Sequence, residues 1–222
     1  MAENGPYSYR SILGYSFSYP LITIIQQLLA LPTKGANEVQ TSPVENGLSS
    51  AAILLIVTSI ESMAIGVSDR KEELGNIQFK PLQKLKEIFD DQLYSKVKEA
   101  FVVRDVIAHG HLWKGNYKYD AEYTTMFFEG EPELVEAFGD KKFKAVMEPN
   151  KTTTRILGLN LFTTRINHSD VLICLDILKQ VSRKFKKDKL LEVSMFEPYM
   201  RTVGSKGKAI TLENLTQQLK SI

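Results

Sequence analysis

The stretch Leu93–His111, LYSKVKEAFVVRDVIAHGH, decides how the rest of this sequence is interpreted. Its apolar side chains recur at the spacing of an α-helix and form one inward row. That row consists of Leu93, Val97, Ala100 and Phe101. The next position of the row is Arg104, so the side that enters the core ends in a cation. The stretch therefore predicts a core helix that carries an arginine at the edge of the hydrophobic interior.

Further apolar rows at helical spacing predict helices before and after this one. Proline suits the first turn of a helix and stops a helix that precedes it, which sets several of the expected boundaries. The predicted helices are Pro20–Leu31, Ser49–Val67, Pro81–Ala108 with a break at Asp90–Asp91, and a last one that is capped by Ser169–Asp170 and ends near residue 187. Residues 32–47 are rich in turn-forming residues and predict a loop.

The pattern changes between the two last helices. Tyr117–Phe128 and Thr152–Ile166 are rich in Thr, Tyr, Phe and Ile and predict strands, and Pro132–Met147 predicts a short exposed helix between them. We therefore expect a mainly α protein: one helical-bundle domain over residues 1–197, with a small inserted β-containing segment at about 115–166, before the last helix. Residues 198–222 are expected to form a polar C-terminal tail that docks loosely or is partly disordered.

Composition excludes several classes of protein. Of the 222 residues, 43% are hydrophobic and 24% are charged, as in an ordinary globular protein, and the net charge of +2 argues against a strongly basic, non-specific nucleic-acid binder. Cys174 is the single cysteine, which rules out a disulfide within one chain and favours a buried, inert thiol. The apolar run Ala51–Val57 is too short to span a membrane. We expect a cytoplasmic protein with no membrane partner.

The residues that can carry chemistry follow the inward row directly. Arg104 and His109 are five residues apart, so the long arginine side chain can reach toward the imidazole across about 7.5 Å of helix. Asp105 and His109 are four residues apart and share a helix face, so the carboxylate can orient the ring. Gly110 is a suitable helix stop and places His109 in the last turn.

These residue types suit RNA cleavage by the neighbouring 2′-hydroxyl. A histidine can take or give a proton, and a guanidinium can hold two phosphate oxygens and stabilise the charge of the transition state. His109-Gly110-His111 with scattered carboxylates is a weak metal signal, so we predict neither a metal site nor a cofactor. His111, Glu61 and Lys114 are secondary candidates for contacts with the substrate.

The run Arg104-Asp105-Val106-Ile107-Ala108-His109 resembles the motif of the HEPN superfamily, in which four to six residues separate an arginine from a histidine. A polar residue after the arginine is frequent in that motif. The resemblance extends to the helical layout over about residues 20–110 and 169–187. It implies a helical bundle that dimerises, so that two motifs form one composite, metal-independent ribonuclease site. Many such proteins act in toxin–antitoxin, antiphage or other RNA-targeting systems, which adds an antitoxin or effector protein as an expected partner.

On this hypothesis His109 is the general acid and base, Arg104 stabilises the phosphate and the transition state, and Asp105 orients His109. The structural alternative for Arg104 is an ion pair with Glu61 or Glu99 at the edge of the core. Two alternatives remain for the whole chain. One is a catalytically inactive HEPN-like module that binds RNA or a protein, and the other is a helical interaction protein in which the arginine and histidine are purely structural.

Overall fold

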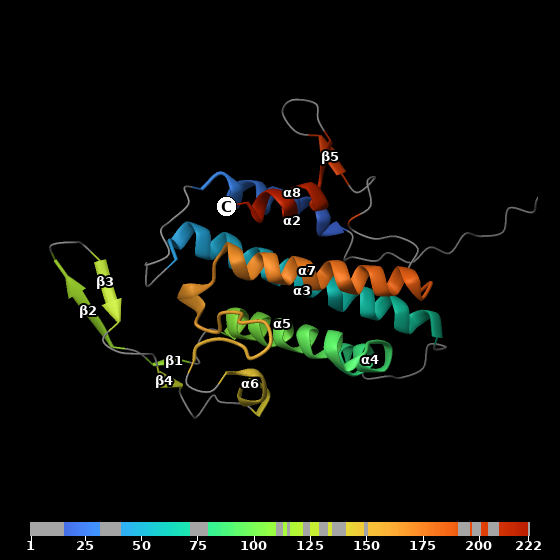
Figure 1. Ribbon diagram of the computed structural model, residues 1–222, viewed down its shortest axis with the longest axis horizontal. Coiled ribbons are helices and arrows are strands. Elements are labelled where there is room, and N and C mark those ends of the chain that lie inside the picture. Colours follow the sequence, from blue (N-terminus) through green and yellow to red (C-terminus); the bar gives the residue numbers. More distant parts are fainter. Residues whose placement is uncertain are drawn as a thin grey trace, which may run out of the picture.

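The protein is mainly helical in the computed structural model (Figure 1). The structure describes residues 16–31, 41–71, 80–109, 113–114, 116–121, 125–128, 133–134, 141–148, 151–190, 196, 201–203 and 209–221. Its helices are α2 (Ser18–Leu29), α3 (Pro43–Lys71), α4 (Pro81–Ile88), α5 (Asp91–His109), α6 (Lys141–Val146), α7 (His168–Lys187) and α8 (Leu212–Leu219).

Helix α3 forms the centre of the bundle. It packs against α2, α4, α5 and α7, and its side chains at Ile53, Ile56, Val57 and Ile60 are completely buried. Figure 1 shows α3 and α7 side by side, with α2 and α8 on one side of this pair and α5 on the other. Burial of these apolar side chains against four neighbouring helices contributes to the hydrophobic stabilisation of the fold.

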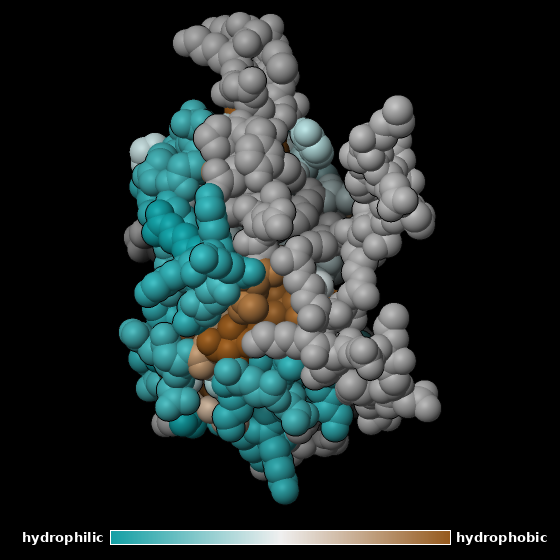
Figure 2. Space-filling view, turned by 90° about the vertical axis from the view of Figure 1, so that its right-hand side faces the viewer, coloured by the Kyte–Doolittle hydropathy of each residue, from teal (hydrophilic) through white to brown (hydrophobic). Residues whose placement is uncertain are grey.

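The same helix, over Pro43–Val67, is long and apolar enough to cross a membrane if length and composition alone are considered. Half of its most apolar window is buried inside the protein, as in a core helix. Figure 2 looks onto the end of the bundle at which α3 and α7 finish, and it shows an apolar area bordered by hydrophilic side chains.

The expected helices are present, and the predicted break at Asp90–Asp91 is confirmed. Phe89 has an extended backbone between α4 and α5, and Asp90 Oδ1 accepts a hydrogen bond of 2.8 Å from the backbone N–H of Leu93. Asp90 thus caps the first turn of α5. The break matters for the site because it sets the direction in which α5 carries Arg104 into the bundle.

The prediction of a loop up to residue 47 is wrong, because α3 begins at Pro43. Ser42 Oγ accepts a hydrogen bond of 3.2 Å from the backbone N–H of Glu45, so Ser42 caps this helix and Pro43 occupies its first position. The predicted cap of the last long helix is also displaced. Helix α7 begins at His168, and Asn167 is its N-cap.

The segment between α5 and α7 agrees only in part with the prediction. Strands β2 (Tyr117–Asp120) and β3 (Thr125–Phe128) pair antiparallel, as expected for 117–128. Strands β1 (Trp113–Lys114) and β4 (Glu133–Leu134) form a second pair, and helix α6 covers only part of the helix predicted at 132–147. The predicted strands at 152–166 are wrong: this stretch forms two isolated bridges and a 3₁₀-helix at Thr163–Arg165.

The part of the predicted tail that the structure describes, residues 201–203 and 209–221, contains regular secondary structure. Strands β5 (Arg201–Val203) and β6 (Ala209–Thr211) form an antiparallel pair, and α8 follows directly. Leu212, Leu215 and Leu219 are buried in the common core, where α8 packs against α2 and α7. The end of the chain is therefore part of the domain, and α7 is not its last helix.

Candidate functional site

Arg104 and His109 both lie in the last turns of α5, at the end of the helix that leads into the β1 strand. His109 is the last residue of α5 and its side chain is exposed. Within the described residues no hydrogen bond to the imidazole is found, so the ring is open to solvent. A histidine in this position is able to exchange protons with a bound ligand.

The side chain of Arg104 is held at the edge of the core and remains 25% exposed. Its Nη1 donates to Glu61 Oε2 of α3 at 3.4 Å, and its guanidinium carbon lies 5.3 Å from the centre of the Phe101 ring. Asp105 Oδ1 lies 2.8 Å from Nε, yet the buried Nε–H is not directed at an acceptor among the described residues. Two carboxylates thus surround a guanidinium that keeps several N–H donors for other partners.

The expected contact between Glu61 and the motif is present, and it joins α3 to α5. Glu99, the other acid considered as a partner of Arg104, is engaged elsewhere. The residue is 1% exposed, and its carboxylate accepts hydrogen bonds from the backbone N–H groups of Ile156 and Leu157, at 3.0 and 2.9 Å. Arg104 is therefore oriented by a half-buried acid on the neighbouring helix.

Asp105 does not occupy the place that its spacing from His109 predicts. Its carboxylate lies against Arg104, and no contact with His109 is found within the described residues. Arg104, the adjacent residue, and His109, one turn away, are both possible partners of the Asp105 carboxylate. The permanent charge of the guanidinium attracts the carboxylate more strongly at short range. Asp105 therefore contacts Arg104 and not the histidine that it was expected to orient.

Glu61 is the secondary candidate that contacts Arg104, and no contact of Lys114 with Arg104 or His109 is found within the described residues. Lys114 is exposed in β1, where its Cα pairs with Glu133 of β4. The preceding residue, Trp113, donates its indole N–H to the carbonyl oxygen of Leu161 at 2.8 Å, which fixes the chain after α5 against the segment before α7. His111 lies outside the described residues.

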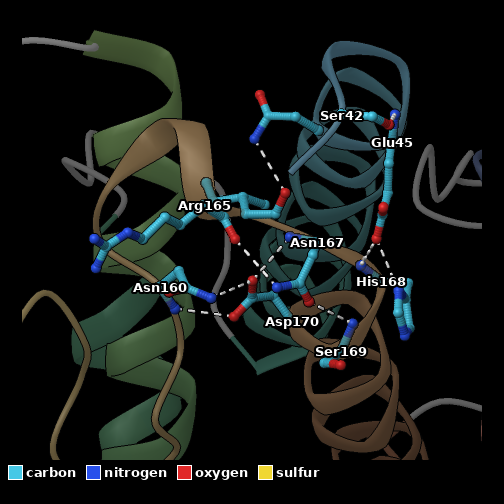
Figure 3. A network of polar contacts seen from close by, with 10 residues as sticks. Ser42, Glu45, Asn160, Arg165, Asn167, His168, Ser169 and Asp170 are labelled. Carbon is cyan, nitrogen blue, oxygen red and sulfur yellow. Dashed lines mark hydrogen bonds and ion pairs between the residues drawn. The ribbon is translucent and has the colours of Figure 1, made fainter. Parts of the chain in front are cut away.

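A histidine–carboxylate pair that the sequence did not predict is formed by His168 and Glu45. His168 Nδ1 lies 2.8 Å from Glu45 Oε1, and the same oxygen accepts from the backbone N–H of His168 (Figure 3). The motif Ser42-x-x-Glu45, a typical helix start, was the signal for this end of α3. The pair connects the first turns of α3 and α7 and has a structural role.

Next to it, Asn167 and Asp170 form a capping box at the start of α7 (Figure 3). Asp170 is buried and also accepts two hydrogen bonds from Asn160, each of 2.9 Å. Burial raises the pKa of the Asp170 carboxyl, while the hydrogen bonds from Asn160 and Asn167 oppose that shift. Burial likewise raises the pKa of the Cys174 thiol, which agrees with an inert cysteine.

Chemically, the end of α5 offers a partly free guanidinium and an exposed imidazole on one helix. Within the described ranges, no group of three or more His, Cys, Asp or Glu side chains is placed to hold a metal ion. Anion binding by Arg104 and proton transfer by His109 are the reactions that these groups support directly. Comparisons of the chain with protein-family models, curated proteins and solved structures gave no match.

Proposed function

We propose that the protein is a metal-independent endoribonuclease of the HEPN type that acts as a homodimer. One observation supports this proposal above the others. Arg104, oriented by Glu61 and Asp105, precedes the exposed His109 by five residues at the end of a core helix. Two groups on one helix need less ordering to meet a single phosphate than groups on separate mobile segments, which supports the proposal.

The proposed reaction is attack of the RNA 2′-hydroxyl oxygen on the adjacent phosphorus. One His109 takes the proton of the 2′-hydroxyl, and a second His109 gives a proton to the departing 5′-oxygen. Arg104 binds the non-bridging oxygens and stabilises the negative charge that they gain in the transition state. The products are a 2′,3′-cyclic phosphate, or its opened form, and a 5′-hydroxyl end. An RNA-targeting effector of the toxin or antiphage type is the role that this activity suits.

A non-catalytic module that binds RNA or a protein is the second candidate. The position of Asp105 favours it, because a carboxylate beside Arg104 leaves the imidazole of His109 without an orienting partner in the described residues. The two candidates differ in one result. A binding module retains RNA unchanged, whereas the nuclease converts it to fragments.

We expect the purified protein to cleave mixed cellular RNA in the presence of EDTA. The reason is that arginine and histidine supply both charge stabilisation and proton transfer, which makes a metal ion unnecessary. The measurement is the appearance of fragments with 5′-hydroxyl ends, which polynucleotide kinase labels without prior phosphatase treatment. Cleavage that appears only after Mg²⁺ or Mn²⁺ is added would contradict the mechanism.

We also expect a homodimer at micromolar concentration, with the ends of the two α5 helices facing each other. A single motif supplies one histidine, whereas in-line cleavage uses both a base and an acid. A two-fold axis at the site provides the second His109 and the second Arg104. Sedimentation equilibrium combined with an activity titration checks this, because specific activity should fall as dilution dissociates the dimer. A monomer with full activity would refute the composite site.

A further inference from the structure

Charge is distributed very unevenly in the segment that lies between α5 and α7. Residues 117–140 contain seven acidic residues and one lysine, which gives a formal charge of −6. Residues 141–165 contain four lysines, two arginines and a single glutamate, which gives +5 in a chain whose net charge is only +2. Such a concentration of cations on one short segment creates a local positive potential that the overall composition hides.

The basic segment is folded onto the helix that carries Arg104 and His109. Helix α6 packs against α5, and Val146 is part of the common core (Figure 1). Most of the cations of this segment point into solvent instead. The exposed ones are Lys141, Lys142, Lys144, Lys151 and Arg155. We call these five residues the basic track.

Side-chain hydrogen bonds fix the backbone that carries the basic track. Arg155 donates from Nε to the carbonyl oxygen of Met147 at 2.6 Å and from Nη2 to that of Lys144 at 3.3 Å, so it closes the C-terminal end of α6. The following turn is fixed by the buried carboxylate of Glu99, which accepts from Ile156 and Leu157. Cations on a fixed scaffold lose less conformational entropy when they bind an extended anion than cations on a mobile loop.

The track also connects to the end of α5. Trp113, four residues after His109, is hydrogen-bonded to Leu161. The backbone N–H of Leu161 donates in turn to the carbonyl oxygen of Thr152, at 2.8 Å, next to Lys151. A short series of direct contacts thus runs from the chain that leaves the candidate site to the basic track.

We infer that the basic track binds the phosphate backbone of single-stranded RNA and leads the strand toward Arg104 and His109. This inference rests on the proposed function for the identity of the polyanion. Protein interfaces usually contain an apolar centre, whereas the apolar residues of α6, Phe143 and Val146, are directed to the core of the protein. Ile156, beside Arg155, is the large exposed apolar side chain of this segment. A row of exposed lysines and arginine is typical of contacts to a phosphate backbone without sequence readout.

The test uses three of the track lysines. We compare Lys141→Gln/Lys144→Gln/Lys151→Gln with the matched control Lys186→Gln/Lys187→Gln/Lys189→Gln, which removes three exposed lysines at the far end of α7. Both sets are placed in a His109→Ala chain, so that the RNA stays intact. The probe is a fluorescein-labelled single-stranded RNA of about 16 nucleotides, near the upper site size of single-strand binding folds. Binding is followed by fluorescence anisotropy at several salt concentrations.

The track variant should bind the RNA roughly tenfold more weakly. The slope of log Kd against log salt concentration should be lower by about 2, because each of the three lost lysine contacts to single-stranded RNA removes about 0.7. The control should keep the wild-type Kd and slope. Equal losses in both variants, no loss in the track variant, or complete displacement of RNA by polyglutamate of equal charge would each overturn the inference. RNA that is bound through the track but never cleaved by the wild-type protein would refute the proposed function and leave the track as an RNA-binding surface.

Discussion

The variant His109→Ala is expected to lose RNA cleavage by about 10²- to 10⁴-fold, the usual contribution of a general acid or base. The loss should reach the upper part of this range because a two-fold site loses both its base and its acid. Stability should be nearly unchanged, since His109 is exposed and is the last residue of α5. Initial cleavage rates and the thermal unfolding midpoint of the same preparation measure the two effects.

His168→Ala is the matched control for this experiment. His168 is a histidine at a helix end as well, and its ring is fixed to Glu45 and remains 33% exposed. We expect this variant to cleave RNA at the wild-type rate, with a modest decrease in stability from the lost contact between the His168 ring and Glu45. Loss of cleavage in His168→Ala together with full activity in His109→Ala would move the active site to the other histidine and refute our assignment.

The variant Arg104→Lys is expected to lose about 10²- to 10³-fold in cleavage, as when one donor to a transition-state oxyanion is removed. Lysine keeps the positive charge, but its ammonium group cannot present a planar pair of N–H donors to two phosphate oxygens. It can still approach Glu61, so the unfolding midpoint should change little. A stable and inactive Arg104→Lys protein therefore supports a role in catalysis.

A purely structural role of Arg104 predicts the opposite pattern, in which activity is kept and stability is reduced. If Arg104 serves only as the partner of Glu61, Arg104→Lys should be fully active, and Arg104→Ala should mainly reduce stability by leaving the Glu61 carboxylate unpaired. Both side chains are about a quarter exposed, so this reduction should stay below about 1 kcal/mol. Adding Glu61→Gln to Arg104→Ala should then restore the unfolding midpoint. Restored stability with no restored cleavage would again point to catalysis.

The helices were predictable because their apolar rows are long and their period is regular. Two errors in the helix boundaries lie where a single polar side chain determines the start of the helix. Ser42 begins α3 and Asn167 begins α7, and both capping patterns are present in the sequence. In each case a stronger nearby signal displaced the predicted boundary. The apolar run at 49–67 moved the start of α3 by six residues, and the pair Ser169–Asp170 moved the cap of α7 by two.

The segment at 152–166 was not predictable from its composition. Its threonines and isoleucines favour strands, but a strand forms only when a neighbouring strand pairs with it. The buried carboxylate of Glu99 binds the backbone at Ile156 and Leu157 and holds the turn that ends this possibility. Helix α8 was missed for a different reason: Leu212, Leu215 and Leu219 are spaced for one helix face but are diluted by polar neighbours.

The residues of the candidate site could be identified from the sequence, whereas most of their side-chain geometry could not. The spacing of Arg104, Asp105 and His109 is fixed by α5, and the sequence shows it. Which of two neighbours the Asp105 carboxylate approaches depends on side-chain rotamers and on the charge of Arg104. The contact between Arg104 and Glu61 depends on the packing of α3 against α5, which periodicity alone does not specify.

Glu99 has a consequence for how this protein can change over evolutionary time. It lies five residues before Arg104 on the same helix, and it alone among the described side chains binds the two amides beneath the turn at 156–157. A lineage that replaces this acid loses the two hydrogen bonds that fix the turn next to Arg155 to α5, although no surface residue has changed. Selection for the surface cations should therefore also constrain this interior residue. We expect the acid at position 99 and the lysines after residue 140 to be retained or lost together.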